Sequence, residues 1–196
     1  MNRTAVVERV TYETRIKVEL NLDGAGEYEI KTGIGFFDHM LVQTARHGFL
    51  DLNINCSGDL GVDTHHTVED TGIALGTAFF KALGNREGIS RYGFKIVPMD
   101  ESLALCAIDF SGRPFLAYNA SFTTSRIGDL DAEMIQEFFR AFTVQAMCTL
   151  HIKLISGINN HHMAEAIFKA FGQAIDQAAA VDPRIKGPRS TKGVLM

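Results

Sequence analysis

The chain has 196 residues, of which 46% are hydrophobic and 21% charged, as expected of one globular domain or two closely joined lobes. Its formal net charge of −4, without a long basic run, argues against nucleic acid or an anionic membrane as a partner. No apolar run reaches the roughly 20 residues of a membrane helix, residues 1–4 do not resemble a signal peptide, and the cysteines are scattered, so we expect a cytoplasmic protein with buried thiols.

The first half of the chain alternates between strand-like and helix-like segments. Polar and apolar side chains alternate over residues 5–22, which predicts a strand, and the glycine-containing residues 23–27 predict a turn into the return strand of a hairpin. Residues 36–47 have helical periodicity, and residues 49–56 alternate like a strand. A second helix is predicted to end near Gly84.

The second half repeats this order. Residues 92–110 predict two strands joined by a turn, and residues 115–122 predict a third strand. An amphipathic helix is predicted over residues 131–150 and a strand over residues 151–157, followed by a closing helix. The halves can therefore be aligned on each other, which indicates duplication of one structural unit.

We expect an α+β fold with two pseudo-symmetric repeats, each a β-sheet backed by helices. The first repeat is assigned to residues 1–92 and the second to residues 93–183, where Pro183 interrupts helical periodicity. Residues 184–196 form a polar, basic C-terminal tail to which we assign substrate binding.

Two copies of one short motif stand out: HHTVE at residues 65–69 and HHMAE at residues 161–165. On a helix, the first histidine and the glutamate of each copy share a face, so they can bind one metal ion while the second histidine reaches towards another. One copy alone is ambiguous, but two spaced copies favour two metal ions. Imidazole and carboxylate donors suit divalent Mn, Fe, Co or Zn, and the absence of cysteine ligands argues against a structural zinc site.

Other candidates lie near these motifs. His39 begins a predicted helix and is a further possible ligand, whereas His47 and His151 adjoin strands and are more typical of structural histidines. Three aspartates flank the ligands and either accept ring N–H groups or cap helices: Asp38, Asp63 and Asp70.

Several cations could bind an anionic group. Arg113 lies in a turn (residues 111–114, SGRP) that can hold a guanidinium for bidentate phosphate recognition, and Lys192 lies in a tail motif (residues 190–193, STKG) rich in hydrogen-bond donors. Arg91 and Lys169 complete this set, and for each the alternative is a solvated surface charge.

Motifs spread over the chain resemble the signatures of the imidazoleglycerol-phosphate dehydratase family; they are residues 36–41 (FFDHML), 45–48 (ARHG), 63–70 (DTHHTVED), 111–114 (SGRP), 160–171 (NHHMAEAIFKAF) and 190–193 (STKG). The resemblance implies a fold like domain 2 of ribosomal protein S5. It also implies dehydration of D-erythro-imidazole glycerol phosphate to imidazole acetol phosphate in histidine biosynthesis. The cofactor implied is Mn²⁺, two ions per active site, at interfaces of a homo-oligomer of 24 chains.

The resemblance also assigns residues. Glu137 departs from a pattern with histidine at this position, so either its carboxylate binds the metal or that coordination position differs. The other metal ligands implied are His39, His65, His66, Glu69, His161, His162 and Glu165.

The chemistry implied passes through an imidazolate and a diazafulvene-like intermediate of the substrate, because no carbonyl group acidifies the carbon-bound proton. Glu13 is the hypothetical acid/base residue, the alternative being an ordinary strand-surface residue. The catalytic set implied is Glu13, His65, Glu69 and Glu165, and the substrate-binding set is Glu13, His39, Gln43, His65, Glu69, Arg91, Arg113, His161, Lys169, Ser190, Thr191 and Lys192.

Two other functions stay open at this point. A binuclear metallohydrolase could use two metal ions, although such sites usually contain aspartates and a bridging carboxylate. A metal-storage cage would predict glutamate-rich helical bundles without strands, and would leave Arg113 and Lys192 without a role.

Overall fold

The computed structural model describes residues 3–195, so Met1, Asn2 and Met196, at the ends of the predicted first repeat and tail, lie outside the described residues. The first half forms a four-stranded sheet in the order β1-β2-β4-β3 and two helices. The elements are β1 (Thr4–Val10), β2 (Thr14–Asn21), β3 (Tyr28–Lys31), α1 (Gly35–His47), β4 (Asp51–Gly58) and α2 (His65–Leu83).

The second half has the same order of elements, with one short addition. Its sheet has the order β5-β6-β10-β7, and as in the first sheet two pairings are antiparallel and the last is parallel. The elements are β5 (Tyr92–Met99), β6 (Ser102–Asp109), β7 (Phe115–Asn119), the small hairpin β8 (Arg126–Ile127) and β9 (Leu130–Asp131), α3 (Met134–Ala146), β10 (Thr149–Ser156) and α4 (Asn160–Ala179). The predicted α+β fold with two sheets backed by helices is confirmed.

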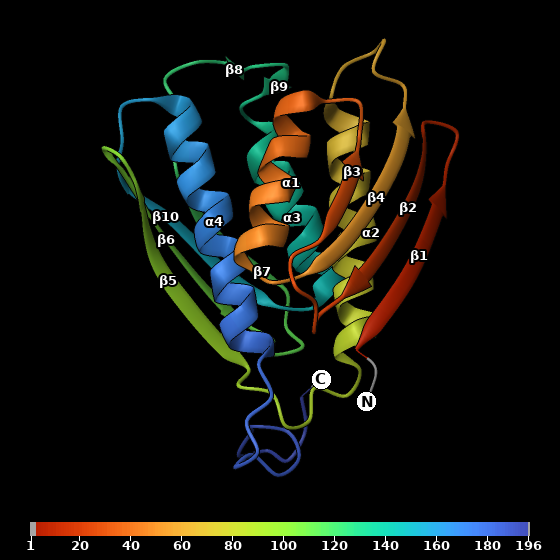
Figure 1. Cartoon of the computed structure of the whole chain (residues 1–196), viewed down its shortest axis with the longest axis vertical. Helices are drawn as coiled ribbons and strands as arrows, with labels where there is room; N and C mark the ends of the chain where they lie inside the picture. The colour runs from red at the N-terminus through yellow and green to blue at the C-terminus, as the bar shows by residue number, and fades with distance from the viewer. Residues whose placement is uncertain (1–2, 196) are drawn as a thin grey trace.

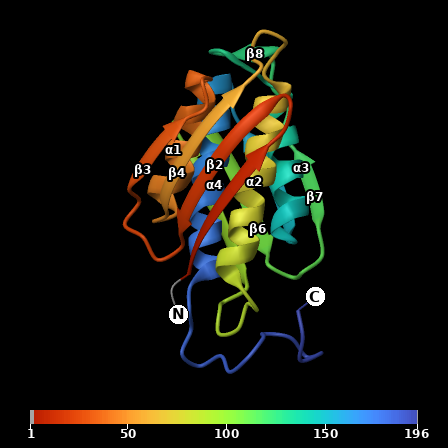
Figure 2. The same ribbon diagram turned by 90° about the vertical axis from the view of Figure 1, so that its right-hand side faces the viewer.

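The four long helices lie between the two sheets (Figures 1 and 2). Helix α2 packs on β1 and β2, α4 packs on β5 and β6, and the helices pair across the repeats as α1 with α4 and α2 with α3. Glycines permit the closest approaches: a Cβ at Gly76 would lie 2.5 Å from the carbonyl oxygen of Phe142, and one at Gly172 would lie 2.6 Å from that of Thr44. The repeats therefore share one hydrophobic core rather than forming separate lobes.

Two strand predictions for the first half are wrong. The predicted single strand over residues 5–22 is the hairpin of β1 and β2, because the chain turns where the N–H of Thr11 donates to the carbonyl of Thr14. Strand β3 does not return along β2 but pairs in parallel with β4, at the far edge of the sheet. Alternation specifies a buried face but does not specify the neighbouring strand.

The predicted helix over residues 131–150 is too long at both ends. Residues up to Asp131 belong to the β8–β9 hairpin, and the helix ends where Met147 takes a left-handed conformation (φ 52°), so that β10 can begin at Thr149. All three cysteines are buried and unpaired, as predicted. Over residues 3–195 we find no helix with the length and apolar content needed to span a membrane.

Candidate metal centres and anion pocket

The second histidine motif begins helix α4. The side chain of Asn159 caps the helix by accepting hydrogen bonds from the backbone N–H groups of His161 (2.9 Å) and His162 (3.3 Å). This cap fixes the first turn, so that His161 and Glu165 lie one above the other on the same face of the helix.

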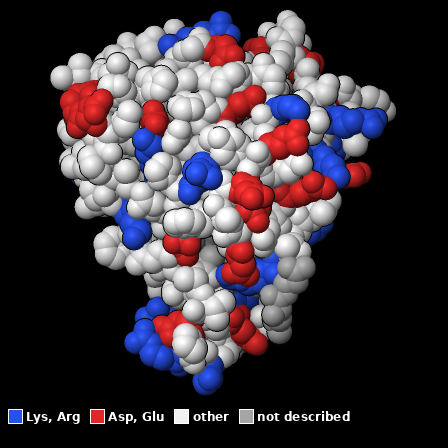
Figure 3. Space-filling view, in the orientation of Figure 1, with Lys and Arg blue, Asp and Glu red and all other residues white. Residues whose placement is uncertain are grey.

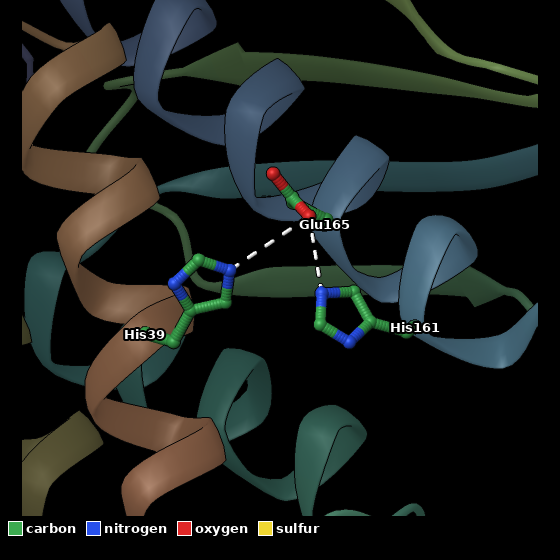
Figure 4. A group of neighbouring side chains, drawn as sticks. All are labelled: His39, His161 and Glu165. Atoms are coloured by element: carbon green, nitrogen blue, oxygen red, sulfur yellow. Dashed lines mark ion pairs between the residues drawn. The ribbon is translucent and has the colours of Figure 1, made fainter.

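His39 of helix α1 faces these two residues (Figure 4). One oxygen of the Glu165 carboxylate lies 3.2 Å from Nε2 of His161 and 3.7 Å from Nε2 of His39, and the three donor atoms all lie within 4.8 Å of one another. We call His39, His161 and Glu165 the α4 cluster. Burial alone favours the neutral acid, but the hydrogen bond and charge of Lys169 outweigh it and hold the pKa of Glu165 below its usual range.

The first motif forms a second group at the start of helix α2. Nε2 of His65 lies 3.7 Å from Oε2 of Glu69, while Arg140 of α3 donates to both Glu69 (2.8 Å) and Glu137 (2.6 Å). We call His65, Glu69 and Glu137 the α2 cluster. Glu137 is therefore near the expected position, but in this structure its partner is the Arg140 guanidinium.

The second histidine of each motif is oriented by a carboxylate that sequence reasoning did not identify. Nδ1 of His66 lies 3.0 Å from Asp59, and Nδ1 of His162 lies 2.8 Å from Glu101. These hydrogen bonds raise the pKa of both histidines, and they leave Nε2 of a neutral ring available to a metal ion. Neither carboxylate lies in a recognisable motif: Asp59 lies in the loop before α2, and Glu101 lies in the turn between β5 and β6.

Within residues 3–195, none of the three aspartates suggested by the sequence accepts a hydrogen bond from a ligand imidazole. The Asp38 carboxylate accepts the backbone N–H of Thr32 (2.8 Å), and Asp63 accepts the backbone N–H of His65 (2.8 Å), which makes Asp63 a helix cap. Asp70 is buried away from the imidazole rings, at the base of the β1–β2 turn.

Glu13 projects from that turn towards the first motif. Its Oε1 lies 3.6 Å from Nε2 of His66. The Thr11 hydroxyl accepts the backbone N–H groups of Glu13 (3.2 Å) and Thr14 (3.0 Å), and the Thr14 hydroxyl donates to the buried carboxylate of Asp70 (2.5 Å). The turn is thus anchored to α2, with the Glu13 carboxylate about half exposed (53%).

The anion-binding candidates gather elsewhere, where the C-terminal tail meets β5. Several cationic side chains of the tail are visible at the lower end of the molecule (Figure 3). Arg91 is buried and forms a two-pronged ion pair with Asp109 (2.7 and 3.0 Å). A pocket of about 650 Å³ is lined by Arg91, Tyr92, Arg113, Arg189, Ser190, Thr191 and Lys192; Tyr92 and Arg189 were not identified from the sequence.

The α4 cluster and this anion pocket lie at opposite ends of helix α4. His161 is in its first turn, whereas the backbone N–H of Arg91 donates to the carbonyl of Ala178 in its last turn. At 1.5 Å per residue these ends are roughly 25 Å apart. Lys169 and Gln43 lie with the α4 cluster instead: Lys169 contacts Glu165, and Nε2 of Gln43 is 3.5 Å from Nε2 of His39.

The remaining two histidines lie outside both clusters. His47 ends helix α1 and lines a pocket with Arg46 and Lys95, and burial lowers the pKa of its ring. His151 is exposed on β10, where its ring lies 6.1 Å from that of Phe115.

The donor chemistry of the clusters fits a divalent transition-metal ion. Each cluster combines imidazole nitrogen with carboxylate oxygen, and the three thiols are buried elsewhere in the core. Three donors in the α4 cluster leave coordination positions open, as a catalytic metal requires.

Comparisons with known proteins agree on one family. The family model described as imidazoleglycerol-phosphate dehydratase matches residues 32–175. The enzyme of that name from Lachnoclostridium phytofermentans is 57% identical over 195 residues, covering 100% of both chains. Crystal structures of that enzyme from Staphylococcus aureus (38% identity, TM-score 0.83, covering 91% of this chain and 99% of that one) and from Pyrococcus furiosus (36%, 0.83, 96% and 100%) have a similar fold.

Proposed function

Because this chain belongs to the imidazoleglycerol-phosphate dehydratase family, we propose that its two histidine clusters hold a pair of Mn²⁺ ions that bind the substrate imidazole. The chain is a hydro-lyase of histidine biosynthesis, and its substrate is imidazole glycerol phosphate. The observation that carries the metal proposal is the α4 cluster, in which donor atoms from two helices converge within 4.8 Å.

The ligands divide between the α4 cluster and the α2 cluster. His39, His161 and Glu165 would hold one ion, and His65 and Glu69 would hold part of the shell of the other. For Glu137 to join the second ion, it must exchange its ion pair with Arg140 for the metal. His66 and His162 are not part of either cluster, and the carboxylates on their Nδ1 atoms leave Nε2 free to bind an ion held partly by a neighbouring chain.

The reaction removes a proton and a hydroxide from neighbouring carbons of the substrate side chain, giving an enol that becomes the ketone. When bound, the metal ions held by these residues would supply Lewis-acid chemistry that favours the imidazolate form of the substrate ring, and elimination would then pass through a diazafulvene-like form of the substrate. Glu13 accepts the carbon-bound proton and donates a proton to the departing hydroxide, which leaves as water. Its half-exposed position beside His66 supports this role.

We further propose that the anion pocket of one chain serves the metal centres of another. A substrate of this size cannot reach across the roughly 25 Å between the two ends of α4. The alternative functions predict different results in an assay with imidazole glycerol phosphate. Release of inorganic phosphate would favour a hydrolase, and two bound ions without dehydration would favour a storage protein. A cytoplasmic location stays a prediction.

Arg113→Ala is expected to raise KM for imidazole glycerol phosphate by about tenfold, the effect of losing roughly 1.4 kcal/mol from one charged hydrogen bond, with a smaller change in kcat. Arg113 is exposed in the anion pocket and, unlike Arg91 with its partner Asp109, forms no ion pair with a carboxylate of residues 3–195. Steady-state kinetics measure the effect, with Arg184→Ala as control, because Arg184 is an exposed arginine of the C-terminal tail that does not line the pocket and pairs with Asp182. An unchanged KM in the Arg113 variant contradicts the assignment.

The second sheet offers a surface for the required second copy of the chain. Its outer face is apolar where β5 and β6 form it: Phe94 and Ile96 are 63% and 53% exposed, and Leu105 points outward from β6 beside them. On the first sheet the strand that corresponds to β5 is β1, where the charged Glu8 lies between the exposed Val6 and Val10. The strand that corresponds to β6 is β2, which presents Arg15, Lys17 and Glu19. The apolar face is continuous with the anion pocket through Tyr92, so a copy seated there can bring its helix ends to that pocket.

Phe94→Asp is therefore expected to reduce the mass of the assembly, because it places a charge in the apolar interface. Light scattering on the full-length protein measures this, with Phe80→Asp as control, since Phe80 is similarly exposed (46%) but lies on helix α2. A wild-type mass equal to that of one chain contradicts self-association altogether.

A further inference from the structure

The connection between β7 and α3 is much longer than its counterpart in the first repeat. Residues 32–34 suffice to join β3 to α1, whereas residues 120–133 join β7 to α3 and include the β8–β9 hairpin. We call residues 120–133 the collar. Ile127 and Leu130 anchor it in the core, with exposed fractions of 6% and 0%. The reaction chemistry described above assigns no role to this segment.

The collar caps helix α1 from the opposite repeat. The Asp129 carboxylate accepts the backbone N–H groups of Gly35 (2.6 Å) and Phe36 (2.8 Å), the first two residues of α1. The residue at the N-cap position, Ile34, has no side-chain acceptor, so Asp129 supplies the cap that the local sequence lacks. His39 follows on the next turn of this helix.

The collar also holds the starts of the other two ligand helices. The amide of Asn160, beside His161, exchanges hydrogen bonds with the backbone N–H (2.8 Å) and hydroxyl (2.9 Å) of Thr123. The Thr64 hydroxyl, beside His65, donates to Asp131 (2.8 Å). The collar then runs directly into α3, which carries Glu137.

We infer that the collar positions the metal ligands, and that Asp129 and Thr123 set the separation of His39 from His161 and Glu165. This inference rests on the proposed function, because it takes the α4 cluster as a metal site. The α4 cluster joins α1 to α4, and the same short segment holds the first turns of both helices. Asp129 and Thr123 are positioning residues, since each acts through the ligand next to it.

The test is Mn²⁺ affinity of the full-length protein, measured by electron paramagnetic resonance titration after chelator treatment. Asp129→Ala is expected to lower the affinity for one of the two Mn²⁺ ions by about tenfold. This is the lower end of the range seen when a residue that supports a metal ligand is removed. Asp129→Asn retains one acceptor oxygen and is expected to recover part of that loss. Thr123→Val is expected to lower the affinity for the same ion, because Thr123 holds the first turn of α4.

Asp51→Ala is the matched control. The Asp51 carboxylate also accepts two backbone N–H groups, from Ala25 (2.8 Å) and Glu27 (3.2 Å), but it lies at the start of β4, away from both clusters. It is expected to lower the melting temperature of the metal-free protein as Asp129→Ala does, while binding Mn²⁺ with wild-type affinity.

The outcomes separate the two proposals. If the wild type binds two ions and Asp129→Ala binds both as tightly, or if Asp51→Ala weakens binding equally, the collar has no positioning role. If the wild type binds no Mn²⁺, the proposed metal centre fails first and the inference fails with it.

Discussion

Replacing Glu13 by Gln is expected to reduce kcat by about 10²- to 10⁴-fold, the range typical of removing a general acid/base. The amide is close to the carboxylate in size but cannot accept the carbon-bound proton. The anchoring of the β1–β2 turn uses the backbone of Glu13 and the side chains of Thr11 and Thr14, so the turn should keep its conformation. KM should change little, because the anion pocket is untouched.

Metal content separates this role from a structural one. Glu13 is outside both clusters, so the Glu13→Gln protein should bind two Mn²⁺ ions with wild-type affinity. Glu8→Gln is the control, since Glu8 is an exposed glutamate on the neighbouring strand β1 and should leave turnover unchanged. Near-normal turnover in the Glu13 variant rules out its acid/base role, and loss of metal assigns it to the coordination shell instead.

Glu165→Gln is expected to remove one of the two Mn²⁺ ions and nearly all activity. Glu165 is only 7% exposed, and its carboxylate contacts the side chains of His39, His161 and Lys169. A neutral amide leaves the Lys169 ammonium without its partner next to the cluster, which raises the electrostatic cost of placing a divalent cation there. We expect affinity at this site to fall by about 100-fold or more.

Metal analysis and circular dichroism together test this result, because loss of metal from an unfolded protein carries no information about ligation. Glu29→Gln is the matched control: Glu29 is exposed on β3, outside both clusters and the collar, and pairs with Lys31. That variant should keep both ions and full activity. A folded Glu165→Gln protein that retains two tightly bound ions contradicts the assignment of the α4 cluster.

The two variants act on different parts of the site, so they distinguish chemistry from metal binding. Glu13→Gln is expected to lower kcat while the protein keeps both metal ions, whereas Glu165→Gln is expected to lower kcat and metal content together. This pattern supports a metal site that binds the ring and a separate residue that moves the proton. Equal loss of metal in both variants contradicts this division.

The sequence by itself determined the helical placement of both histidine motifs and the duplication of the fold. Helical spacing places His161 and Glu165 on one face without any tertiary contact, and the Asn159 cap lies directly before them. The order of strands and helices repeats because each half carries the same local periodicities. Local patterns of this kind depend only on residues that are close in the chain, so the sequence is enough to predict them.

Only the tertiary structure decided which distant residues meet. The pairing of β3 with β4, the approach of His39 to Glu165 and the cap that Asp129 gives to α1 join segments remote in sequence. The same holds for Glu101, whose carboxylate orients His162 from the β5–β6 turn. Asp59 is only seven residues from His66, but it lies in a loop without a motif, so its contact with the ring also emerges only from the fold. Such contacts follow from the packing of the two repeats around a shared core, which no local periodicity encodes.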